Sequence, residues 1–165
     1  AAALEEVTYE AYGPGGVGII VEAATDNKNR TYPEIRTALT KNGGTMADAG
    51  SVMFQFTRKG VIRVAATGED ALLQVLDAGA EDAIEEGGGL TVYTDMKDLA
   101  KVRAALVQAG LNVEDAELQY VANNDVPVGD METARKLMKV LDAVEELDDV
   151  TNVHTNADIT VDIDE

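Results

Sequence analysis

The sequence predicts an α+β protein of two domains, one inserted into the other. Its middle part alternates short strands with amphipathic helices in the order βαββαβ, which is the order of the ferredoxin-like split unit. The flanking parts have few strands each, and neither buries much apolar surface alone. We therefore expect an inserted ferredoxin-like domain at 61–127 and an outer α+β domain made of 1–60 plus 128–165.

The outer domain is predicted to begin with a hairpin. Residues 5–12 and 17–24 are apolar-rich runs, and Gly13-Pro14-Gly15-Gly16 separates them. Two such runs around a Gly-Pro turn are typical of a β-hairpin. The polar residues 25–30 then indicate a loop rich in Asx-turn residues.

A short helix is predicted to follow this loop. Thr31 and Glu34 have the spacing of a capping box, and Pro33 suits a first helical turn. Beyond the helix, 51–57 is predicted to be a strand and Arg58-Lys59-Gly60 a turn.

The spacing of apolar residues along the sequence predicts each strand and helix of the inserted unit. The predicted strands are 61–65, 81–86, 90–94 and 116–121, and the predicted helices are 69–78 and 95–109. After a linker at 123–129, the outer domain resumes with a helix at 131–147, a strand at 150–155 and an acidic tail at 159–165. The last helix carries its basic residues early and its acidic residues late, against its macrodipole, at a cost of a few tenths of a kcal/mol per charge.

Composition excludes several classes of protein. The chain has 165 residues, no Cys and no Trp, which removes disulfides, thiol catalysis and Cys-based zinc sites. With two Phe and five Tyr, a base-stacking surface built on aromatics is not expected. No apolar run of 18 residues and no signal peptide is visible, so we expect a cytoplasmic protein without a membrane contact.

A basic island occupies residues 28–63. It has seven Lys or Arg against two acidic residues, although the whole chain carries a net charge of −18. Such an asymmetry favours one face that meets a polyanion; the alternative is a solvated face with ion pairs worth under about 1 kcal/mol each. The predicted nucleic-acid-binding residues are Lys28, Asn29, Arg30, Arg36, Lys41, Arg58 and Lys59.

Catalytic and metal-binding motifs are weak. His154 is the single histidine, so neither a His-based zinc site nor a Ser-His-acid triad is indicated. The pairs Glu85-Glu86 and Asp148-Asp149 fit solvated charge better than acid–base catalysis or magnesium binding. We therefore expect no catalytic residue, no metal and no cofactor, and a protein that is not an enzyme.

Seven segments resemble signatures of the YebC family in order along nearly the whole chain. They are 9–16 (YEAYGPGG), 25–31 (TDNKNRT), 42–48 (NGGTMAD), 50–52 (GSV), 56–61 (FTRKGV), 78–82 (AGAED) and 147–153 (LDDVTNV). The family is similar to the mitochondrial translational activator of cytochrome c oxidase subunit one. The resemblance implies a helical N-terminal domain, an α+β domain and a ferredoxin-like domain inserted in it; the Lys-rich helical domain has no counterpart in this sequence.

What the resemblance implies about function is a factor in gene expression. Many bacterial members are labelled probable transcriptional regulators, and others are described as ribosome-associated factors that help translation through proline-rich stretches. We expect a ribosome- or RNA-associated factor whose cations meet rRNA or tRNA phosphates, with ribosomal proteins as further partners. The alternatives are a DNA-binding transcriptional regulator and a ligand-sensing or protein-interaction module. The expected location is the bacterial cytoplasm, or the mitochondrion for an organellar member.

Overall fold

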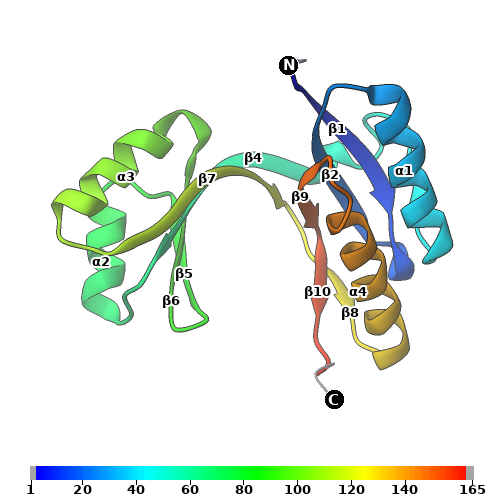
Figure 1. Ribbon diagram of the computed structural model, residues 1–165. Coiled ribbons are helices and arrows are strands. Elements are labelled where there is room, and N and C mark those ends of the chain that lie inside the picture. The colour runs from blue at the N-terminus through cyan, green and yellow to red at the C-terminus, as the bar shows by residue number, and fades with distance from the viewer. Residues whose placement is uncertain (1–2, 163–165) are drawn as a thin grey trace. The chain divides into compact units, whose positions relative to one another are not determined.

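The computed structural model describes residues 3–162 of a mixed α/β chain. The chain divides into two compact units (Figure 1). Unit 1 consists of Ala1–Thr57 and Val121–Glu165, and unit 2 is the intervening segment Arg58–Tyr120. These bounds differ from the expected 61 and 127, because the strands that enter and leave unit 2 are continuous with backbone of unit 1 and no separate linker marks the passage.

Unit 1 is built on an antiparallel sheet in the order β3-β1-β2-β9. The predicted hairpin is confirmed: Glu5 of the first strand pairs with Thr25, and Tyr12 pairs with Gly18. Gly15 and Gly16 have positive φ in the connecting turn, a conformation open to glycine. The four strands are β1 (Glu5–Tyr12), β2 (Gly18–Thr25), β3 (Thr45–Met46) and β9 (Val150–Thr155).

Two helices, α1 (Lys28–Lys41) and α4 (Met131–Glu145), pack on one face of this sheet (Figure 1). Their apolar stripes meet alternate residues of β2 in a core that includes Ile19, Val21, Ile35, Leu39, Leu137, Val140 and Val144. A second, parallel pair of strands, β8 (Val126–Val128) and β10 (Ala157–Ile159), completes the unit. None of the described helices is long and apolar enough to cross a membrane.

Helix α1 begins one turn earlier than predicted. The N-cap is Asn27, whose side chain accepts a hydrogen bond from the backbone N–H of Asn29. The predicted capping box at Thr31 is therefore wrong, and Pro33 lies inside the helix. The physical reason is that Thr31 is buried and its hydroxyl is bonded to side chains outside the helix.

Unit 2 contains a four-stranded sheet in the order β5-β6-β4-β7. Its own core is formed by one face of the sheet and two helices, and includes Ile62, Val64, Val75, Leu90, Val92, Val102 and Leu106. In chain order the elements are β4 (Phe56–Val64), α2 (Glu69–Asp77), β5 (Asp82–Glu86), β6 (Gly89–Asp95), α3 (Leu99–Gln108) and β7 (Val113–Ala122). Short 3-10 turns, η2 (Met53–Gln55) and η3 (Met96–Asp98), precede β4 and α3.

The turn predicted at Arg58-Lys59-Gly60 is wrong, because these residues lie within β4. Lys59 pairs with Asp95 and Gly60 with Thr94 across the sheet. A Cβ at position 60 would collide with the hydroxyl of Thr94 and with Leu99. The glycine therefore serves close packing in the middle of a strand rather than chain reversal.

Candidate nucleic-acid interface

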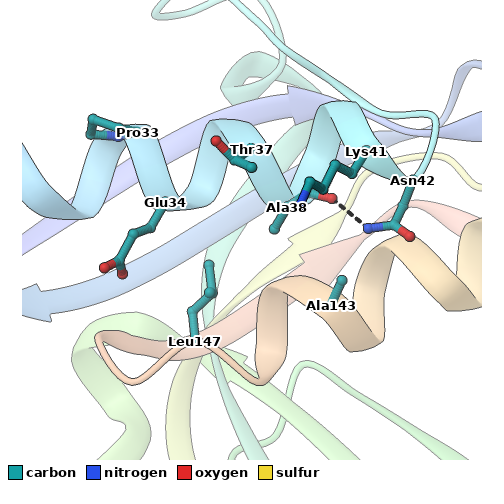
Figure 2. Close-up of a pocket in the computed structure, with 8 residues that line it drawn as sticks. All are labelled: Pro33, Glu34, Thr37, Ala38, Lys41, Asn42, Ala143 and Leu147. Carbon is teal, nitrogen blue, oxygen red and sulfur yellow. Dashed lines mark hydrogen bonds between the residues drawn. The ribbon is translucent and has the colours of Figure 1, made fainter.

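A groove runs between α1 and α4 on the surface of unit 1 (Figure 2). Its volume is about 490 Å³. Both helices contribute, because their buried stripes face the sheet and their flanks face each other. The lining residues are Pro33, Glu34, Thr37, Ala38, Lys41, Asn42, Ala143 and Leu147.

The groove is apolar in its middle and charged toward its ends. Ala38, Ala143 and Leu147 lie between the two helices, with Glu34 toward the start of α1 and Lys41 toward its end (Figure 2). The end of α1 is fixed by Asn42, whose amide donates a 2.7 Å hydrogen bond to the Ala38 carbonyl. Lys41 therefore lies in the last turn of a helix whose end is capped.

Basic side chains continue this surface along α4. Lys139 precedes Ala143 by four residues and Lys136 precedes it by seven, spacings that keep residues on one flank of a helix. Both line a hollow on the exposed side of α4. Lys136 pairs with Glu132 at 3.1 Å, with both side chains more than half exposed, so this pair contributes little stability. We call Lys41, Lys136 and Lys139 the groove cations.

The first basic residues of the island are engaged in ion pairs. The Lys28 ammonium lies 2.9 Å from a Glu5 carboxylate oxygen, and the Arg30 guanidinium lies 2.9 Å from Asp149 and 3.2 Å from Asp26. The Glu5 carboxylate raises the pKa of Lys28, and the Asp149 carboxylate raises the pKa of Arg30. Much of the charge at the start of α1 is thus compensated within unit 1.

Asp149 joins the start of α1 to the segment that follows α4. Its carboxylate accepts hydrogen bonds from the Thr31 hydroxyl at 2.7 Å and from Arg30 at 2.9 Å. These bonds, the hydroxyl first and the guanidinium second, hold the pKa of Asp149 below its usual value. Arg30 and Thr31 therefore join the start of α1 to Asp149, and the contact of Arg30 with a phosphate stays a prediction.

The remaining predicted residues of α1 are exposed, but they do not form one cluster. Arg36 and Lys41 are five positions apart, which places them about 140° apart around the helix, and only Lys41 lines the groove. Asn29 is exposed, and its backbone N–H donates to Asn27. Within residues 3–162, neither Arg36 nor Lys41 makes an ion pair.

Arg58 and Lys59 belong to unit 2 and have partners there. The Arg58 guanidinium lies 4.4 Å from the centre of the Tyr120 ring, a cation–π distance. The Lys59 ammonium lies 3.2 Å from a Glu81 carboxylate oxygen. The seven predicted residues are thus divided between two units, and five of them are on α1.

The residues predicted from the sequence to bind nucleic acid leave out the basic residues of α4. The signal that could have found them is the reversed charge order of this helix, with Arg135, Lys136 and Lys139 near its start. Lys136 and Lys139 line a hollow on α4, and Ala143, four residues after Lys139, lines the groove together with Lys41. Basic residues near its start are unfavourable for α4 as an isolated helix. Such an order is explained if these residues bind an anion together with Lys41 of α1.

The histidine and the carboxylates are the remaining groups that could bind a metal ion or act in catalysis. Across the described part of the chain, no three His, Asp or Glu side chains are placed to hold a metal ion. His154 lies with its Nε2 2.7 Å from a Glu22 carboxylate oxygen, and both side chains are largely buried between β2 and β9. This pair links two neighbouring strands.

Comparison with known proteins agrees with this architecture. The family model described as "TACO1/YebC second and third domain" matches residues 4–157. A probable transcriptional regulatory protein of Thermobifida fusca is 51% identical over 158 residues, which are 94% of this chain and 63% of that protein. A protein of the same description from Nocardioides is 47% identical over 96% of this chain and 66% of its own length.

A solved structure gives the same result for the fold. The crystal structure of a conserved hypothetical protein from Aquifex aeolicus superposes with a TM-score of 0.93 at 39% identity, over all of this chain and 69% of that one. The chain spans slightly under two thirds of the length of the curated relatives above.

Fold and surface together define a two-unit α/β protein with basic residues grouped on the helical side of one unit. Two relatives with this architecture are described as probable transcriptional regulatory proteins. The chain belongs to the TACO1/YebC family, and its match is to the second and third domains of that family.

Proposed function

We propose that this chain is a non-enzymatic gene-expression factor that docks on nucleic-acid phosphates through the groove cations, with ribosomal or transfer RNA as the first candidate. One observation carries the proposal: in the described chain, Lys41 and Lys139 make no ion pair, although acidic residues outnumber basic ones 31 to 13. Ammonium groups left without carboxylates in so acidic a chain are suited to an external anion.

RNA is favoured over a specific DNA site by the way the helices are held. A helix that reads the major groove must project its side chains at base edges. Here α1 and α4 lie against one sheet, and the flank of α1 in the groove presents Glu34 beside Lys41. A lysine contacts phosphate as a point charge without reading sequence. DNA stays as the second candidate because relatives are named probable transcriptional regulatory proteins.

We also propose that unit 2 is a ferredoxin-like domain inserted in unit 1. Its strand order β5-β6-β4-β7 and its βαββαβ succession support this interpretation. Its position between two sequence segments of unit 1 supports the insertion. Lys41 and Lys139, which make no ion pair in the described chain, both belong to unit 1, so we place phosphate contact on unit 1.

Binding to ribosomes and to duplex DNA across a salt series tests the docking proposal. The double variant Lys41→Gln/Lys139→Gln removes two cations, so the slope of log K against log salt should fall by about 0.9 per lost phosphate contact. The matched control is Lys97→Gln/Lys101→Gln, which removes the same charge from unit 2. Equal losses in both double variants, or none in either, would overturn the proposal. Stronger salt-dependent binding to DNA than to ribosomes would make DNA the partner.

A further inference from the structure

Phe54 is the most exposed of the large apolar side chains in the described chain. It lies in η2, just before β4, and 72% of its surface is accessible. A single exposed apolar residue is ordinary on a protein surface. What distinguishes Phe54 is the hollow beside it, whose other lining residues are mostly polar.

The hollow has a volume of about 270 Å³ and lies wholly within unit 1. Phe54 forms one side of it. The other lining residues are Val126, four residues with side-chain amides and one aspartate: Gln55, Asn123, Asn124, Asn156 and Asp125. An aromatic face next to amide donors and a carboxylate acceptor offers stacking and hydrogen bonding at one place.

Two of these amides fix the wall. Asn156 accepts a 2.7 Å hydrogen bond from the Gly18 backbone N–H and donates a 2.8 Å bond to the Gln55 side-chain oxygen. Since that oxygen is taken, the Gln55 NH₂ group is left to donate elsewhere. The Asn123 side chain donates to the Phe54 carbonyl at 3.3 Å, which ties the backbone of Phe54 to the segment at 123–126.

The other two polar groups are available to a ligand. Within residues 3–162, the side chains of Asn124 and Asp125 make no hydrogen bond or ion pair. An asparagine amide supplies donors and an acceptor, and an aspartate carboxylate supplies acceptors. The hollow thus presents free groups of both kinds beside the ring.

The segment that carries Phe54 is held in place before any ligand arrives. Glu10 of β1 accepts hydrogen bonds from the backbone N–H groups of Gly50, Val52 and Met53 at 2.6, 2.9 and 2.6 Å. The chain next to Phe54 is therefore anchored to the sheet of unit 1. Because this backbone is already ordered, its ordering adds no cost when a flat group stacks on the Phe54 ring.

We propose that Phe54 and this hollow bind one unpaired nucleobase of an RNA strand. The base stacks on the Phe54 ring, and its edge exchanges hydrogen bonds with Gln55, Asn124 and Asp125. This inference rests on the proposed function for its choice of ligand. It differs in mechanism, because stacking is insensitive to salt whereas phosphate contact is not. The small number of aromatic residues in the chain is compatible with this proposal, because one ring is enough to stack one base.

A tryptophan placed at this position reports stacking directly. The chain contains no Trp, so Phe54→Trp gives a single fluorophore in the hollow. Single-stranded RNA hexamers of each base are added, and we expect saturable quenching of its emission. The matched control is Leu73→Trp, which places the fluorophore at a 54% exposed position in unit 2 and senses only light absorption and collision. Linear quenching that is equal at both positions would overturn the inference.

A second change separates this site from the groove. In the Phe54→Trp chain, Asn124→Ala/Asp125→Ala should raise the hexamer concentration at half-saturation roughly tenfold. An unchanged half-saturation would overturn the role of these side chains. If groove variants alter ribosome binding while quenching in the Phe54→Trp chain stays linear, the nucleobase site is wrong and the docking function stands. If quenching is saturable while the groove variants bind ribosomes as the parent does, the nucleobase site stands and the docking function is wrong.

Discussion

Glu10 illustrates how one buried carboxylate organises a loop. Only 8% of this residue is accessible, and its two oxygens receive three backbone N–H groups from the segment 50–53. Burial on its own would raise the pKa of Glu10, but the three hydrogen bonds outweigh burial and the pKa is lowered. The ionised form is therefore favoured by folding. Its stabilisation is present above the unfolded-state pKa and is lost as the pH falls through the folded-state pKa.

Glu10→Gln is expected to destabilise the chain at pH 7 by about 1–3 kcal/mol, because an amide cannot accept all three bonds and its NH₂ group has no acceptor there. Urea unfolding of parent and variant gives the difference. Below about pH 4, where a glutamate is protonated when unfolded, the gap should shrink as the parent's carboxylate also becomes neutral. Glu6→Gln, at an exposed position on the same strand, should stay within about 0.5 kcal/mol. A gap that is the same at all pH values contradicts the ionic account.

The residue scale also shows why the site was only partly predictable. The cations of α1 are visible in the sequence as a local excess of charge. The ion pairs that neutralise two of these cations are not visible in the sequence. Lys28 meets Glu5 and Arg30 meets Asp149 only after the sheet has formed, and the second pair spans 119 positions. The exposure of Phe54 was not predictable either, because 51–57 is predicted to be a strand whereas the structure has a 3-10 turn at Met53–Gln55.

At the element scale, local patterns located most helices and strands. The hairpin, α4 and β9 lie where apolar periodicity and turn residues indicated, because short-range signals decide them. The start of α1 was misplaced since two residues, Asn27 and Thr31, are both good caps and a tertiary contact to Asp149 decides between them. The predicted strand at 61–65 began too late, because β4 begins at Phe56. Gly60 was interpreted as a turn residue, and a single sequence does not distinguish a glycine in a turn from one that allows close packing within a strand.

Gly60→Ala tests that interpretation of β4. Gly60 has no space beside it: an added methyl group meets the buried hydroxyl of Thr94 and the side chain of Leu99 at 3.0 Å. Overpacking of this kind typically costs about 1–3 kcal/mol, which urea unfolding measures. Removing the obstructing hydroxyl in Gly60→Ala/Thr94→Ala should cost less than the sum of the two single changes. Additive losses would mean that the two groups do not collide.

At the scale of the whole molecule, charge restricts where a polyanion can bind. Unit 1 has seven Lys or Arg against nineteen Asp or Glu, and unit 2 has six against twelve. Both units therefore repel nucleic acid at long range, and attraction is confined to local surfaces within about a Debye length, roughly 8–10 Å at physiological salt. Such a local surface needs cations without a carboxylate partner, and Lys41 in the groove and Lys139 on α4 are two of these in the described chain.

Two separate cores give the last prediction. The core of unit 1 includes Leu137 and that of unit 2 includes Leu106; both residues are fully buried and neither core shares a buried residue with the other. Truncating a buried leucine to alanine costs about 2–5 kcal/mol in the cooperative unit that contains it. Hydrogen exchange read by mass spectrometry resolves where protection falls.

Leu106→Ala should therefore accelerate exchange in peptides from Arg58–Tyr120 and leave α1 and α4 protected, whereas Leu137→Ala should do the reverse. The reason is that each leucine supports only the sheet and helices of its own unit. Because β4 and β7 carry the chain between the units, exchange at their unit 1 ends tests how far each cooperative unit extends. Equal acceleration throughout the chain in both variants would show that the two cores unfold as one.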